Sequence, residues 1–358
     1  MRIDNVAGRR IALLVALVVA AGLILVAVRA PDDERPGSSA SSTILPTSTP
    51  ATSSTTAALG GDLPLGVLTP GGSASTDCPR GFDCSSFQVT CPGVAGSSDG
   101  TLAVRLPPDP RGLVVLFSGG IGDQWWSAGQ GRPAASMFEH LAEQSLGLVQ
   151  VRWPDGWLVA PAGAEVGPAA LACRPATVAA WIHDNVYEAS VGSDHAGTCG
   201  FCLTGNSGGA SQVAYALTRY GLAPLIDGAV LTSGPPHTSL DAACGIDSSD
   251  PALVFGPREA RTIDASYGAA AGGPCARHDV AFQARFAQDS VDGVPPPNLD
   301  GVRLRIILGA DDQTSAPSHA RVFAQWIGDL DVVEVPGMTH PIQQSQQAVD
   351  LLAEEVAG

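Results

Sequence analysis

The chain contains no lysine, so all 19 of its basic residues are arginine, against 35 acidic residues. A missing lysine excludes Schiff-base chemistry, a Ser-Lys dyad and a P-loop lysine. The formal net charge of −16 argues against a nucleic-acid partner, because neutralising phosphates requires clustered cations. The charge instead fits the solvated surface of an exported domain.

Cysteine is also absent from the first 77 residues, and eight follow: Cys78, Cys84, Cys91, Cys173, Cys199, Cys202, Cys244 and Cys275. An even number predicts disulfides and an oxidising compartment. Cys244 and Cys275 are the expected pair, since both fall in one apparent insertion. The pair Cys199 and Cys202 precedes an expected strand rather than a helix, which argues against a redox motif. No second close pair supports a zinc site, so we expect neither a metal nor a cofactor.

One long uncharged run lies near the N-terminus, residues 11–28. Its length suffices to span a bilayer as a helix. Arg9 and Arg10 precede the run and acidic residues follow it, which predicts a single-pass anchor in the cell membrane with the N-terminus inside and the rest of the chain outside the cytoplasm. The alternative is a cleaved signal peptide and a secreted protein, because Val28 and Ala30 resemble a small-residue cleavage site.

Composition divides the chain into three parts. Residues 1–35 form the cytoplasmic tip and the anchor or signal segment. Residues 36–77 are mostly Ser, Thr, Pro, Ala and Gly, which predicts a disordered stalk. Residues 78–358 suffice for one large α/β domain, and residues 238–300, rich in Gly, Pro and Asp, form an insertion over one end of its sheet. No internal repeat is present, and the sequence does not indicate an oligomeric state.

Short apolar runs alternate with amphipathic stretches through the C-terminal part. Strands are predicted at 102–106, 113–117, 146–151, 201–204, 229–232, 303–308 and 332–335. Helices are predicted at 175–189, 208–220, 317–327 and after residue 342. This alternation predicts an α/β fold with a mostly parallel central sheet flanked by helices.

Two serines stand in a Gly-x-Ser-x-Gly pattern, Ser98 and Ser207. Ser98 precedes the first expected strand and has no helix after it, which predicts a turn serine. Ser207 directly follows a strand and begins a helix. At such a junction the serine oxygen is exposed above the sheet, and larger side chains at Gly205 and Gly209 would collide with the bend. Ser207 is therefore the candidate nucleophile.

A serine nucleophile requires a base and a group that orients the base. His340 follows the strand at 332–335 and a Pro-Gly turn. Asp311 and Asp312 follow the strand that ends near Gly309. Each lies just past the carboxyl end of a strand, as Ser207 does.

The order Ser207, acid, His340 resembles the α/β-hydrolase superfamily over roughly residues 100–358. The resemblance implies that the acid stands three residues after Gly309, which selects Asp312. It also implies an oxyanion hole made by the amide of Gly208 and an amide of the loop Ser118-Gly119-Gly120, where Gly120 is the expected donor and Gly119 the alternative. The histidine that usually opens this loop is missing.

Four tryptophans, Trp125, Trp126, Trp153 and Trp157, are expected on loops at the same end of the sheet, where they line a substrate pocket or pack the insertion onto the domain. The sequence predicts a serine hydrolase that cleaves a small-molecule or lipid carboxylic ester through an acyl-enzyme. A serine peptidase of the same fold and a catalytically silent envelope-binding module remain the alternatives.

Overall fold

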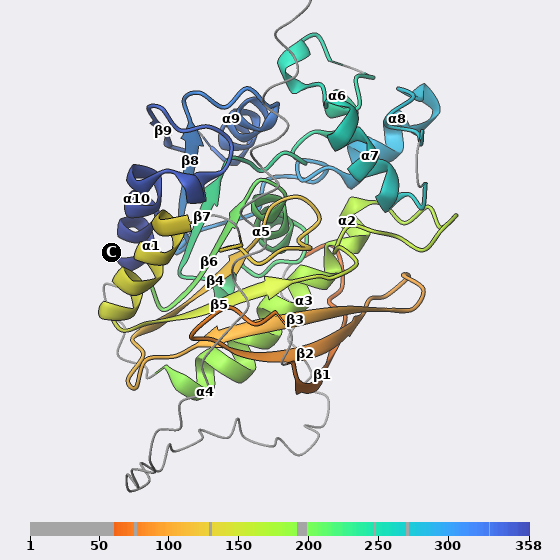
Figure 1. Cartoon of the computed structure of the whole chain (residues 1–358). Coiled ribbons are helices and arrows are strands. Elements are labelled where there is room, and N and C mark those ends of the chain that lie inside the picture. Colours follow the sequence, from red (N-terminus) through yellow and green to blue (C-terminus); the bar gives the residue numbers. More distant parts are fainter. Residues whose placement is uncertain are drawn as a thin grey trace, which may run out of the picture. The chain divides into compact units, whose positions relative to one another are not determined.

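One nine-stranded sheet runs through the residues that this computed structural model describes, namely 61–74, 77–128, 131–191, 199–246, 248–269, 272–328 and 330–358. The strand order is β1-β2-β3-β5-β4-β6-β7-β8-β9 (Figure 1). The strands are Val67–Ser73 (β1), Asp83–Thr90 (β2), Ser97–Arg105 (β3), Gly112–Phe117 (β4), Leu146–Arg152 (β5), Phe201–Asn206 (β6), Gly228–Thr232 (β7), Arg303–Gly309 (β8) and Val332–Val335 (β9). β4, β5, β6, β7, β8 and β9 pair parallel with one another. β1, β2 and β3 pair antiparallel with their neighbours, and β3 joins the parallel part through β5. The mostly parallel sheet predicted from the alternating pattern is confirmed.

Helices cover both faces of this sheet. They are Gly131–Glu143 (α1), Pro168–Leu171 (α2), Cys173–Ile182 (α3), Glu188–Ser190 (α4), Gly208–Thr218 (α5), Leu240–Ala243 (α6), Pro257–Ser266 (α7), Gln283–Asp289 (α8), Ala316–Ile327 (α9) and Gln346–Ala357 (α10). Successive side chains of a strand point to opposite faces. Val114 and Leu116 of β4 accordingly pack with α1 and α10, while Leu113 and Val115 pack in a second cluster with α3, α5 and α9. Both faces are thus buried, as parallel strands require.

The stalk predicted to run through residue 77 ends earlier than expected. Residues 67–73 form β1, which pairs antiparallel with β2 at the edge of the sheet. The strand is exposed almost throughout and contains Pro70, Gly71 and Gly72, so it shows no apolar alternation. Backbone hydrogen bonds to β2 stabilise this edge strand. Because these bonds do not depend on the side chains, the composition of residues 67–73 does not predict a strand. The predicted span 11–28 lies outside the described residues.

Ser98, predicted in a turn, lies instead within β3, opposite Val89 of β2. The first residues of β3 are polar and mostly exposed because β2 and β3 form an antiparallel hairpin with one solvent-facing side. The sequence therefore showed the apolar second half of this strand and not its beginning. The second Gly-x-Ser-x-Gly match contributes to an extended strand, with no bend and no helix after it.

All eight cysteines form disulfides: Cys78–Cys84, Cys91–Cys173, Cys199–Cys202 and Cys244–Cys275. The last of these is the pair expected within the insertion. Cys199 and Cys202 are fully buried at the beginning of β6, not at the start of a helix. Cys91–Cys173 joins the end of β2 to α3 and so fastens the antiparallel edge to a helix that covers the sheet.

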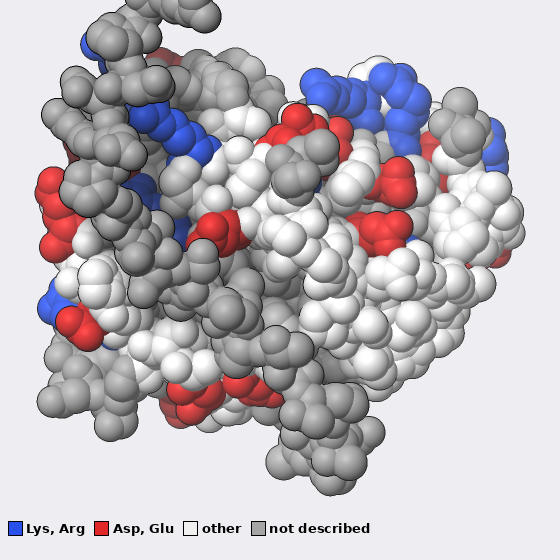
Figure 2. Space-filling model, turned by 60° about the horizontal axis from the view of Figure 1, so that its bottom comes forward, with Lys and Arg blue, Asp and Glu red and all other residues white. Residues whose placement is uncertain are grey.

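The segment between β7 and β8 contains the short helices α6, α7 and α8, and it corresponds to the expected insertion 238–300. Figure 1 shows these three helices gathered beside α2, which α7 and α8 contact. On the face seen in Figure 2, acidic side chains are scattered among uncharged ones. Across the residues that the structure describes, no helix is both long and apolar enough to cross a membrane.

Candidate active site

Ser207 occupies a sharp bend between β6 and α5. Its backbone adopts φ 55° and ψ −118°, a conformation that residues other than glycine rarely take. The bend is fixed by a hydrogen bond from the Ser207 amide to the Thr232 carbonyl of β7, at 2.8 Å. A Cβ atom at Gly205 would collide with the backbone of Gly209, and one at Gly209 with the carbonyl of Phe117. The two glycines are therefore needed for the steric reason that the sequence suggested.

His340 and Asp312 meet across the ends of β9 and β8. His340 Nδ1 lies 2.8 Å from Asp312 Oδ2. The Asp312 side chain is fully buried, while that of His340 keeps 28 % of its surface exposed. The other carboxylate oxygen, Oδ1, accepts hydrogen bonds from the amide and the hydroxyl of Thr314, at 2.9 and 2.8 Å. Asp311 is exposed, and the acid that reaches the imidazole is Asp312.

These contacts decide the charge of the Asp312 carboxyl. Burial by itself raises its pKa, but the hydrogen bond and charge of His340, with the two bonds from Thr314, lower the pKa more strongly. The net direction is a pKa below the ordinary value, so the carboxylate is ionised at neutral pH. An ionised acid that accepts a hydrogen bond from Nδ1 fixes the tautomer in which Nε2 is free to accept a proton.

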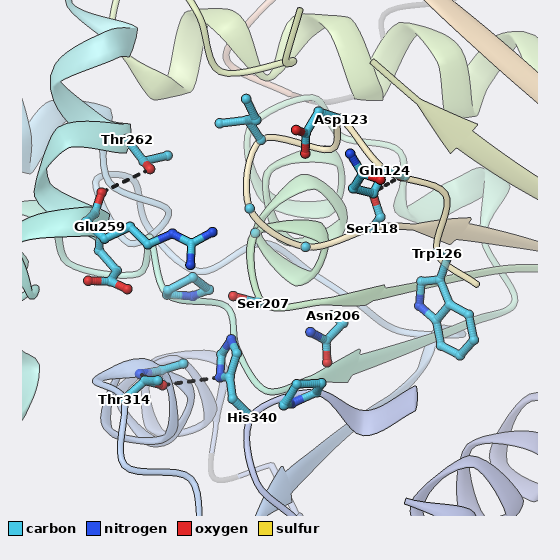
Figure 3. A pocket seen from close by; sticks show the side chains of 18 of the residues that line it. Ser118, Asp123, Gln124, Trp126, Asn206, Ser207, Glu259, Thr262, Thr314 and His340 are labelled. Atoms are coloured by element: carbon cyan, nitrogen blue, oxygen red, sulfur yellow. Dashed lines mark hydrogen bonds between the residues drawn. The ribbon is translucent and has the colours of Figure 1, made fainter. Parts of the chain in front are cut away.

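Ser207 and His340 line one pocket of about 720 Å³. Figure 3 shows the serine hydroxyl and the imidazole pointing toward one another inside it. Ser207 is partly exposed, although the residues immediately before and after it are buried. The structure thus brings the three side chains selected from the sequence to one place.

Two further side chains hold the loop that carries His340. Ser233 Oγ, just after β7, donates a hydrogen bond to the His340 carbonyl at 2.6 Å. Asn206 Oδ1, next to the serine, accepts one from the amide of Ile342 at 3.4 Å. Sequence reasoning missed Ser233, Asn206 and Thr314. Asn206 lies within the Gly-x-Ser-x-Gly pattern, which was the one available signal.

The expected oxyanion loop lies against the start of α5. A Cβ at Gly208 would collide with the carbonyl of Gly120, so the two backbones approach as closely as glycines permit. Gly120 has φ 60° and, with Gly119 and Gly208, lines the pocket. Among the described residues, the amides of Gly120 and Gly208 donate to no other protein group. Free amides beside a nucleophile are the donors that a developing oxyanion requires.

All four tryptophans are buried, and two of them also line the pocket. Trp125 and Trp126 line the pocket. Trp153 and Trp157 are fully buried and pack in the core, Trp153 edge-on against Phe87. Within the described part of the chain, no group of three or more His, Cys, Asp or Glu side chains is arranged to hold a metal ion.

The fold and the site together define the class of this protein. A mostly parallel sheet, a strand-bend-helix around Ser207, and an acid and a histidine after later strands in the order Ser207, Asp312, His340 are the features of the α/β-hydrolase fold. The fold predicted from the sequence is confirmed.

Comparison with known proteins finds no matching family model and no matching curated protein. Similar solved structures include Est1E from Butyrivibrio proteoclasticus, with 16% identity over 76% of this chain and 95% of that one, at a TM-score of 0.44. A dienelactone hydrolase from Anabaena variabilis shows 13% identity over 77% and 95% of the two chains, with a TM-score of 0.40. A hyperthermophilic esterase from the archaeon Pyrobaculum calidifontis shows 14% identity over 76% and 84%, with a TM-score of 0.46. The assignment of the fold rests on the strand order and the site of this chain.

Proposed function

We propose that the protein is a serine hydrolase that cleaves carboxylic esters through an acyl-enzyme. The observation that supports this most directly is the hydrogen bond between the buried Asp312 and His340, which lines one pocket together with Ser207. In this proposal His340 Nε2 takes the proton of Ser207 as its oxygen attacks the ester carbonyl, and then gives the proton to the leaving alcohol. A water molecule then attacks the acyl-enzyme through the same steps, which frees Ser207 and releases the carboxylic acid. Asp312 orients the imidazole, and the amides of Gly208 and Gly120 stabilise the oxyanion.

Covalent labelling of the full chain tests the nucleophile. A fluorophosphonate probe is expected to label the wild type, and Ser207→Ala to abolish both labelling and turnover of p-nitrophenyl esters of graded chain length. His340→Ala is expected to lose nearly as much activity, since members of a triad act as a unit. Ser98→Ala is the matched control, because Ser98 lies in β3, and it is expected to keep both signals.

A peptide-amide panel measured beside the esters separates the alternatives. Faster cleavage of amides than of esters would make the protein a peptidase, which the same groups permit. Labelling that survives in Ser207→Ala would remove the serine from its role. A folded wild type that neither reacts with the probe nor turns over either panel would support a silent binding module.

We further propose that the domain is exported and anchored by residues 11–28. The length of the uncharged run and the arginines before it support an anchor, and four disulfides favour an oxidising compartment. The full-length protein is expected to stay in the membrane fraction through a high-salt wash, with its N-terminus before Ile11. A mature N-terminus mapped at Pro31 or later would instead make the segment a removed signal and the protein secreted.

A further inference from the structure

The proposed oxyanion loop is a tight turn made mostly of glycine. The amide of Gly122 donates to the Gly119 carbonyl at 3.1 Å and closes the turn. Gly120 and Gly122 have φ 60° and 78°, in the left-handed region that favours glycine. Glycine has more backbone freedom than any other residue, so a turn of this composition does not by itself hold an amide in one direction.

The loop lies directly beside the candidate nucleophile. Figure 3 shows the chain between Ser118 and Asp123 curving past Ser207. A Cβ atom added at Gly119 would lie 3.6 Å from the Cβ of Ser207. A displacement of this loop by about 1 Å would move its amide away from a reacting carbonyl, and an error of that size can cost about 10²-fold in rate.

The turn that follows β5 binds three successive carbonyls of the loop. The indole Nε1 of Trp157 donates to the Gly120 carbonyl at 3.4 Å, and its backbone amide donates to the Ile121 carbonyl at 2.9 Å. The amide of Trp153 donates to the Gly122 carbonyl at 2.8 Å. Two of these bonds come from the backbone, whereas the bond to Gly120 depends on the side chain of Trp157.

These bonds fix the direction of the Gly120 amide. Its peptide group contains the Gly119 carbonyl, which the amide of Gly122 binds from within the turn. In a trans peptide the N–H points opposite to the C=O, so the Gly120 N–H points out of the turn. The next peptide group contains the Gly120 carbonyl, which Trp157 holds. A Cβ at Gly208 would lie 2.9 Å from the Gly120 nitrogen, so the two proposed oxyanion donors belong to residues that lie side by side.

A buried cation holds Trp157 in turn. Nη1 of Arg174, on α3, donates to the carbonyls of Trp157 and Val159 at 2.7 and 2.9 Å. Arg174 is 5 % exposed and forms no ion pair with any carboxylate that the structure describes. Burial lowers its pKa to about 10, so the guanidinium stays charged at neutral pH. A buried charge is costly unless hydrogen bonds compensate it, and here the compensating carbonyls belong to the segment that binds the oxyanion loop.

We propose that Trp157 is a positioning residue of the oxyanion hole, whose indole N–H holds the Gly120 carbonyl so that the Gly120 amide faces the developing oxyanion, and that Arg174 keeps Trp157 in place. This inference rests on the proposed ester hydrolysis for its role in turnover. Trp157 does not line the pocket, so it acts through Gly120 and not by touching the substrate. Its bond favours the transition state over the bound ester, because the negative charge on the carbonyl oxygen develops only as the serine attacks.

Trp157→Phe removes the indole N–H and keeps an aromatic ring and the backbone bonds. In the full chain, kcat for p-nitrophenyl butyrate is expected to fall about tenfold or more, with KM within about twofold of the wild type. Trp181→Phe, on the partly exposed side of α3, is the matched control and should keep the wild-type kcat. Each variant is assayed well below its own thermal midpoint, because a smaller ring at a buried site also destabilises the fold.

A trifluoromethyl ketone separates positioning from packing. The hydroxyl oxygen of Ser207 bonds to the ketone carbon, its proton passes to His340, and the ketone oxygen becomes an oxyanion. Trp157→Phe is expected to weaken this inhibition by about the same factor as it lowers kcat. Binding of the uncharged ester to Ser207→Ala, measured by calorimetry, should change less than about twofold when Trp157→Phe is added. A loss of packing alone would weaken ester binding as well.

Arg174→Lys keeps a buried cation for the same carbonyls, whereas Arg174→Met removes it. Arg174→Lys is expected to keep more of the wild-type kcat than Arg174→Met. Equal kcat in the wild type and a folded Arg174→Met would overturn the role of Arg174, and Trp157→Phe decides the proposal if Arg174→Met does not fold.

The outcomes separate this role from the reaction itself. Wild-type kcat and wild-type inhibitor affinity in Trp157→Phe would overturn the role of Trp157 while leaving the proposed function intact. A folded wild type that neither hydrolyses the ester nor binds the ketone would overturn the proposed function, and the positioning role with it.

Discussion

At the scale of single residues, two adjacent carboxylates differ sharply in surroundings. Asp312 is buried against the His340 imidazole, whereas Asp311 is exposed and uses its backbone amide to bond the Met338 carbonyl. Asp312→Asn is expected to lower turnover of a p-nitrophenyl ester by up to about 10⁴-fold, because the histidine would adopt the wrong tautomer. Asp311→Asn should stay within about tenfold of the wild type.

Both asparagine variants must keep the thermal midpoint of the wild type for this comparison to hold, since changes in the acid loop can also destabilise the domain. The opposite ranking would contradict the role given to Asp312. Two fully active variants would show that another group orients the imidazole.

The residues to which we assign the chemistry were predictable, but those that position them were not. Ser207, Asp312 and His340 have recognisable residue types at the ends of apolar runs. Ser233 acts on His340 across 107 positions of sequence, and Asn206 on Ile342 across 136. Such contacts exist only once the sheet has brought the strand ends together, and serine and asparagine are too common in turns to stand out beforehand.

At the scale of elements, most of the strands that were predicted are buried on both faces. Strands β4 to β8 are almost entirely buried, because helices cover both of their faces. β9 was predicted from its valines, although it is only partly buried. β1 and β2 were missed because they belong to the antiparallel edge, where polar side chains face solvent. The helix α1 was also missed, although its buried residues Ala134, Met137, Phe138 and Leu141 repeat at helical spacing. In the insertion, α6 and α8 have only four and seven residues, too few for a period to be seen, and α7 buries only Ala260 and Ile263 as apolar side chains.

At the scale of the whole molecule, two buried histidines link folding to pH. Burial, with the nearby His319, lowers the pKa of His237 to about 3. Burial lowers the pKa of His319 to about 4, against a smaller opposing effect of its bond to the Leu253 carbonyl. An unfolded histidine has a pKa near 6.5, so between that value and the folded one the unfolded chain binds more protons. The stability that the neutral histidines contribute is complete above about pH 6.5 and is lost as the pH falls toward 3 to 4.

At pH 5 each histidine is expected to cost about 2 kcal/mol of unfolding free energy relative to pH 8. His319→Gln keeps a donor for the Leu253 carbonyl but cannot titrate. Denaturant unfolding at the two pH values should therefore show a loss about 2 kcal/mol smaller in this variant than in the wild type. Burial raises the pKa of Asp292 to about 6, so protonation of this carboxyl stabilises the folded chain as the pH falls. Because Asp292 is present in both proteins, the quantity to compare is the difference between their losses of unfolding free energy.

His140→Gln is the control for the substitution itself, because His140 is exposed and its replacement removes no buried imidazole. If the unfolding free energy fell equally between pH 8 and pH 5 in His319→Gln and in the wild type, His319 would have the same pKa in the folded and unfolded chains.

The residues that line the pocket come from two parts of the fold, the ends of the strands and the segment between β7 and β8. The proposed reacting groups stand at the carboxyl ends of β6, β8 and β9, whereas Phe255, Arg258, Glu259 and Thr262 reach the pocket from the segment between β7 and β8. That segment has its own covalent closure, Cys244–Cys275, and joins the sheet only at its two ends. Part of it packs in the core with α5, but Arg258 is exposed, and a substitution there can change the pocket wall without moving a strand of the sheet. The lining of the pocket can thus vary at this segment while Ser207, Asp312 and His340 keep their places at the strand ends.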